Sequence, residues 1–86
     1  LTLQSVEECR AFFRDLCTPA ELQALTDRWT VVGLLKSGLP YREISKQTGV
    51  SLTTIGRVAR CLMGGDGGYQ IASERIQHHK QKSQHI

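Results

Sequence analysis

The segment from residue 40 to residue 63 constrains the fold of this 86-residue chain more than any other feature. Two short apolar patterns meet there at Gly49, and a glycine adopts without steric cost the positive φ angle that a turn between two helices needs. Ser45 supplies the small side chain required where two steeply crossing helices touch. The core between these helices would come from four apolar residues: Ile44, Val50, Ile55 and Val58. The pattern predicts a helix-turn-helix over residues 40–63.

The outward face of the second of these helices is basic and contains no acidic residue. At 100° per residue, Val58, Ala59, Leu62 and (marginally) Leu52 lie within about 60° of the core direction set by Ile55. Arginines and a threonine lie on the opposite side. Arginine suits bidentate contact with guanine, and threonine suits a phosphate or a thymine methyl. We expect these residues to face the bases of double-stranded DNA: Leu52, Thr53, Gly56, Arg57 and Arg60.

Charge is unevenly distributed along the chain, although the net charge is only +3. Residues 1–27 carry two arginines and five acidic residues, whereas residues 28–63 carry six basic residues and one acidic residue. A polyanion is therefore attracted to the middle third. Within that third, Arg42 and Lys46 are expected to contact DNA phosphates. A basic face that only meets solvent is the alternative interpretation.

The chain before this segment also has helical periodicity, so we predict an all-α fold. Apolar residues recur at helical spacing over about residues 3–16. The apolar face that they form is larger than a helix of this length needs for packing against its own chain, which indicates a partner chain. Thr18 to Glu21 is typical of a capped helix start, and the following helix reaches about Lys36, either unbroken or divided near Thr26. The glycine-rich residues 64–68 end the helical domain, predicted as residues 1–68. Residues 69–86 are predicted to be a polar tail, in part helical over 71–82.

Composition limits the other possibilities. A core this small is marginal without an additional source of stability, and an odd number of cysteines (Cys9, Cys17 and Cys61) argues against a disulfide framework. We expect these thiols to be buried and reduced, and dimerisation to supply the stability. His78 and His79 lack an evident third ligand, so no metal is expected. The sequence contains no recognisable set of catalytic residues, so an enzyme is not expected.

Two further expectations concern location. No apolar run approaches the length of about 20 residues that crosses a membrane. The first residues lack the features of a signal peptide. We therefore expect a cytoplasmic protein without membrane contact.

Several segments resemble the tryptophan repressor superfamily: CTPAELQALTDR (17–28), LLKSG (34–38), YREI (41–44) and TIGR (54–57). The resemblance covers residues 17–63, and the sequence GGDGGY (64–69) is similar to the YerC/YecD-like branch. It implies an intertwined homodimer, built by the N-terminal helices, that presents two helix-turn-helix units to successive major grooves. It also implies a transcriptional regulator, most often a repressor.

The resemblance further implies a ligand pocket in which two arginines enclose a small-molecule co-repressor. The matching positions in this chain are Arg28 and Arg57, with Thr18 beside them. Two departures argue against tryptophan as the ligand: Val58 stands where the family has a glycine, and Cys61 replaces a hydrogen-bonding serine. A repressor gated by another small molecule remains one alternative. An adaptor that binds proteins and not DNA is the other.

Overall fold

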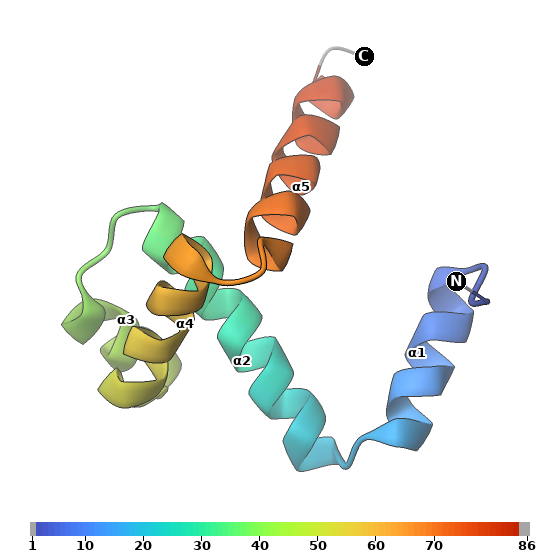
Figure 1. Cartoon of the computed structure of the whole chain (residues 1–86), viewed down its shortest axis with the longest axis horizontal. Coiled ribbons are helices and arrows are strands. Elements are labelled where there is room, and N and C mark those ends of the chain that lie inside the picture. The colour runs from blue at the N-terminus through green and yellow to red at the C-terminus, as the bar shows by residue number, and fades with distance from the viewer. Residues whose placement is uncertain (1, 85–86) are drawn as a thin grey trace.

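The computed structural model describes the backbone of residues 2–84 and the side chains of residues 2–76. This part of the chain forms five helices: α1 (Val6–Leu16), α2 (Pro19–Lys36), α3 (Tyr41–Thr48), α4 (Leu52–Gly64) and α5 (Gly68–Gln84). Figure 1 shows α3 and α4 packed near the C-terminal end of α2, whereas α1 projects away from them beyond a sharp bend. The predicted all-α fold is confirmed.

Side-chain caps fix the start of the first two helices. The Glu8 N–H donates to Ser5 Oγ at 3.1 Å, so α1 begins at Val6 and not at residue 3 as the apolar stripe suggested. The predicted capping box at the start of α2 is present. The Glu21 N–H donates to Thr18 Oγ1 at 3.1 Å, and the Thr18 N–H donates to Glu21 Oε1 at 2.8 Å.

Helix α2 is continuous through the region where a break was one of the two predicted alternatives. The Thr26 hydroxyl donates to the Leu22 carbonyl, and the Thr30 hydroxyl donates to the Thr26 carbonyl, both at 3.0 Å. Because these hydroxyls bond back along the helix, they do not compete for the backbone as they would in a turn. The helix therefore reaches Lys36 as one continuous element.

The capping box makes the pKa of Glu21 a test of the start of α2. Hydrogen bonds from the Thr18 backbone N–H and from its side chain lower the pKa of Glu21. A lowered folded-state pKa contributes stability above the unfolded pKa, and this contribution is lost as the pH falls through the folded value. We expect Thr18→Ala to lower the free energy of unfolding by about 1 kcal/mol through loss of the cap. It should also raise the Glu21 pKa toward its ordinary value by removing the side-chain hydrogen bond, while the backbone N–H of residue 18 still lowers it. An NMR titration that found the same Glu21 pKa in both proteins would contradict this account.

The core lies where α2, α3 and α4 meet. All four residues predicted to fill the helix-turn-helix core are buried there, as expected. Helix α2 contributes Val31 and Val32, and partly buried apolar residues complete the cluster: Leu34, Leu35, Leu39, Leu62 and Tyr69. The C-terminal half of α2 is thus the support against which the helix-turn-helix is held.

The segment predicted as a polar tail forms helix α5, which packs against α2 and α4. Tyr69 joins the core cluster, and its ring centroid lies 6.4 Å from that of Trp29. Lys36 Nζ donates to Gln70 Oε1 at 3.2 Å and to Ser73 Oγ at 2.7 Å. These contacts join residues more than 30 positions apart, which sequence periodicity does not reveal. The domain boundary at residue 68 stays a prediction, and residues 1, 85 and 86 lie outside the described residues.

Three expectations about composition can be compared with the described residues. Cys61 is exposed, so its predicted burial is wrong, whereas Cys9 and Cys17 are partly buried; all three are free thiols. Within residues 2–76, no cluster of histidine, cysteine and acidic side chains could hold a metal ion. The side chains of His78 and His79 lie outside the described part. No helix in the described chain combines the length and the apolar character needed to span a membrane.

Candidate DNA-binding surface

The turn between α3 and α4 is closed by side-chain hydrogen bonds. Gly49 has a φ of 76°, as predicted for the turn, and its N–H donates to the Ser45 carbonyl at 2.8 Å. The Ser45 hydroxyl donates to the Val50 carbonyl at 2.7 Å. Thr48 Oγ1 donates to the Ile44 carbonyl and accepts the Val50 N–H. The sequence indicated Ser45 only through its small size, and its polar role was missed, as was the role of Thr48.

The N-terminus of α4 is capped by the Ser51 side chain. Ser51 Oγ accepts the Thr54 N–H at 3.1 Å and donates to Thr54 Oγ1 at 2.9 Å. Leu52 is the first residue of the helix, and its side chain is 51% exposed. The first turn of α4 contains no acidic residue, so nothing in it neutralises the positive end of the helix dipole.

Helix α4 is oriented as predicted. Ile55, Val58 and Ala59 are buried, and Leu62 is partly buried against the same core. The side chains of the outward face are exposed, with Gly56 partly exposed between them: Leu52, Thr53, Arg57 and Arg60. The arginines are therefore available to an external partner and do not pack into the core.

Arg60 lies across the one position of this face that has no side chain. A Cβ atom placed on Gly56 would be 3.6 Å from Arg60 Nη1, an ordinary van der Waals separation. The guanidinium group therefore folds back over the preceding turn of α4. A larger side chain at residue 56 would take the space that the guanidinium group uses.

Helix α3 adds two exposed basic side chains near α4. Arg42 and Lys46 are four residues apart and therefore lie on one side of the helix. The acidic residue of this helix, Glu43, accepts a hydrogen bond from Gln47 Nε2 at 3.3 Å. All seven residues that the sequence assigned to DNA contact lie on α3 or α4 and none of them is buried, and their contact with DNA remains a prediction: Arg42, Lys46, Leu52, Thr53, Gly56, Arg57 and Arg60.

The five residues predicted for a ligand pocket have different surroundings in the structure. Thr18 caps α2, and Arg28 is partly buried on the same helix. Arg57 is exposed, Val58 lies in the core, and Cys61 borders a shallow hollow near Gly67 and Tyr69. A co-repressor site at these residues therefore remains a prediction.

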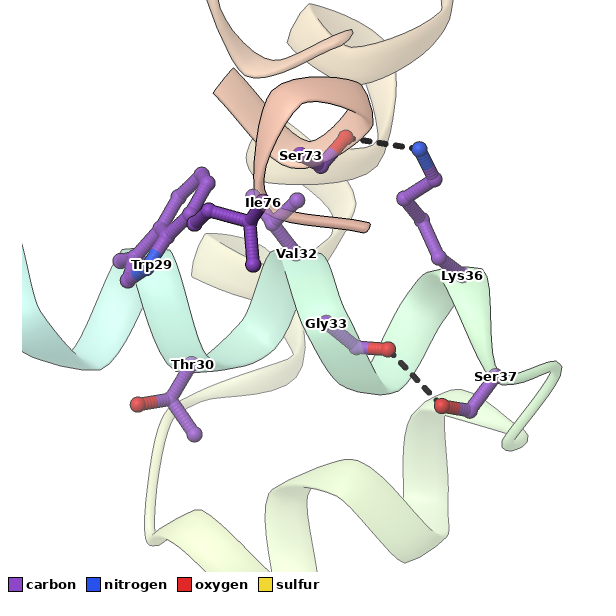
Figure 2. Close-up of a pocket in the computed structure, with 8 residues that line it drawn as sticks. All are labelled: Trp29, Thr30, Val32, Gly33, Lys36, Ser37, Ser73 and Ile76. Atoms are coloured by element: carbon purple, nitrogen blue, oxygen red, sulfur yellow. Dashed lines mark hydrogen bonds between the residues drawn. The ribbon is translucent and has the colours of Figure 1, made fainter. Parts of the chain in front are cut away.

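A hollow with a volume of about 440 Å³ lies between α2 and α5. Figure 2 shows Trp29, Val32 and Ile76 side by side at one end, with the Lys36 side chain reaching Ser73 at the other. The remaining lining residues are Thr30, Gly33 and Ser37. Sequence reasoning missed this groove because one of its walls is α5.

A large apolar surface is left uncovered by the chain itself. None of the residues of α1, all of which the structure describes, is buried. The rings of Phe12 and Phe13 contact each other edge to face, with centroids 5.4 Å apart, yet each ring is nearly half exposed. Further exposed apolar side chains lie on α1, α2 and α5: Val6, Leu16, Leu25, Trp29, Ile71 and Ile76.

Comparison with known proteins gives consistent matches over most of the chain. The family model described as "Trp repressor protein" matches residues 1–77. The uncharacterized protein YerC of Bacillus subtilis (strain 168) is 45% identical over 76 residues, which cover 88% of this chain and 73% of YerC.

Two solved structures match the fold. The crystal structure of a TrpR-like protein from Eubacterium eligens ATCC 27750 has a TM-score of 0.80 and 37% identity, over 88% of this chain and 78% of that one. A candidate Trp repressor from Staphylococcus aureus has a TM-score of 0.78 and 41% identity, over 88% and 76% of the two chains.

Proposed function

We propose, since the chain belongs to the Trp repressor family and to its YerC-like branch, that this helix-turn-helix regulator is a sequence-specific DNA-binding protein that acts as a homodimer. One observation carries the proposal. The outward face of α4 presents Arg57 and Arg60 to solvent, while Ile55 and Val58 fix the opposite face in the core. A helix held in this way can enter the major groove without rearranging its own packing.

The two helices would divide the contacts with DNA. Helix α4 would lie in the major groove, where an arginine can donate two hydrogen bonds to O6 and N7 of one guanine. Arg42 and Lys46 on α3 would contact the phosphates and so fix the orientation of the protein on the duplex. The hydrogen bonds around Ser45 and Thr48 support this role because they hold the angle between α3 and α4.

Dimerisation is supported by the apolar surface that one chain leaves exposed. We infer that a second copy covers the faces of α1 and of the N-terminal half of α2, and that it fills the groove between α2 and α5. Covering Phe12, Phe13 and Trp29 would add stability to that of the small core of one chain. Two helix-turn-helix units related by a two-fold axis would then bind half-sites about 34 Å apart.

Repression is the mode of regulation that we propose. A dimer that occupies two successive major grooves denies the same stretch of DNA to other proteins. The operator would be a palindrome because the two copies of α4 are related by symmetry. Its position relative to a promoter would then decide which gene is repressed.

Selection of bound duplexes from a random pool, repeated at two salt concentrations, tests the proposal. We expect enrichment of a palindrome whose half-site centres are about 10 base pairs apart. We also expect the affinity to fall steeply with salt, because basic residues that bind phosphates release counterions. A pool that remains random, together with a weak dependence on salt, would contradict DNA binding and favour the adaptor interpretation.

A further inference from the structure

The exposed apolar side chains fall into two groups with different surroundings. Most lie on α1, α2 and α5 and belong to the surface that we assign to the dimer. Leu52 is separate, because it begins α4, within the surface that we assign to DNA. Its isobutyl group is 51% exposed and follows directly on the cap of α4, next to Thr53, whereas Met63, the other large exposed apolar residue of α4, lies near the opposite end of the helix.

The position of Leu52 relates it to Gly56 and Arg60. The three residues are spaced at intervals of four, so they form one strip along α4. Arg60 Nη1 folds back over Gly56, which brings the guanidinium group toward the leucine end of the strip. Hydrogen-bond donors and an apolar group therefore stand next to each other on one face of the helix.

We propose that Leu52 determines specificity by contacting the C5-methyl group of a thymine in each half-site. This inference rests on the proposed function, and it names the chemistry that one side chain recognises. The major-groove edge of thymine is the one that presents a methyl group, and apolar side chains recognise it by contact. The N-terminal residues of a helix in the major groove are those that contact base edges, and Leu52 is the first residue of α4.

Single-atom changes in the DNA test the contact. In the duplex selected from a random pool, each thymine is replaced in turn by deoxyuridine, which removes only the methyl group, and affinities are measured by fluorescence anisotropy. At one thymine of each half-site, we expect the wild-type affinity to fall about fourfold, and about fifteenfold when both half-sites are changed. Leu52→Ala should bind the unmodified duplex more weakly and should not respond to deoxyuridine at that position.

Met63→Ala is the matched control. Met63 is also an apolar residue of α4, is 87% exposed and lies near the other end of the helix. We expect this variant to respond to deoxyuridine as the wild type does. Circular dichroism should show unchanged helix content in both variants because neither side chain is buried.

The outcomes separate this inference from the function on which it rests. A selected duplex whose affinity is unchanged by deoxyuridine at every thymine would overturn the role of Leu52 alone. Full deoxyuridine sensitivity in Leu52→Ala would do the same. A wild-type protein that enriches no sequence would overturn the proposed function, and this inference with it.

Discussion

Replacing both Phe12 and Phe13 with aspartate is expected to convert the protein from a dimer into a folded monomer. Each phenylalanine buried at an interface contributes about 1.5–3 kcal/mol, and a two-fold interface loses each of them twice. Carboxylates left at the interface would add a desolvation cost. From these burial energies, we expect the dissociation constant of the dimer to rise by a factor on the order of a thousand or more. Sedimentation equilibrium measures it directly.

Ala11→Asp provides the matched control for this prediction. Ala11 is exposed on α1, and at 100° per residue it lies on the side of the helix opposite Phe13. It therefore adds a negative charge to the same helix without entering the apolar face. The core cluster contains no residue of α1, so circular dichroism of the double variant should retain the signal of α2, α3 and α4. A double variant that sediments as a dimer would show that α1 is not part of the interface.

The helix-turn-helix could be predicted from sequence because its determinants are local. Gly49, Ser45 and the four core residues lie within 15 positions of one another. The motif requires a glycine in the turn, a small residue where the helices cross and apolar residues in the core, and these residues meet those requirements. The capping box at Thr18 is equally local. The orientation of α4 followed from the helical repeat alone. The same repeat places Cys61 about 120° from the core direction, so its exposure was predictable although burial was assumed.

Features that depend on contacts between distant residues could not be predicted in the same way. The apolar residues of α2 have two different environments within the single chain. Val31 and Val32 are buried by α3 and α4, whereas Leu25 and Trp29 remain exposed in the single chain. Helix α5 is held by Tyr69 and by the hydrogen bonds of Lys36, none of which produces periodicity. The groove between α2 and α5 was missed for the same reason.

Replacing Arg57 or Arg60 with alanine is expected to remove much of the sequence-specific affinity for DNA. A bidentate contact with guanine contributes about 1–3 kcal/mol, so each substitution should weaken binding about 5- to 150-fold for each half-site. Stability should hardly change, because both side chains are exposed and point away from the core. The two effects need not add, since the arginines share one face of α4.

Arg10→Ala and Arg75→Ala are the controls that separate recognition from charge. Each removes one positive charge, but Arg10 lies on α1 and Arg75 on α5, both outside the surface assigned to DNA. We expect them to change the affinity only through the weaker, long-range attraction that depends on net charge. They should therefore bind the selected duplex nearly as well as the wild type at moderate salt.

The equilibrium dissociation constants of these variants for the selected duplex measure the role of the arginine face of α4 most directly. The account predicts that the dissociation constants of Arg57→Ala and Arg60→Ala exceed those of the two control variants by a factor of about five or more. It would be contradicted if all four variants bound with equal affinity, because the DNA would then respond to total charge and not to the side chains that α4 presents.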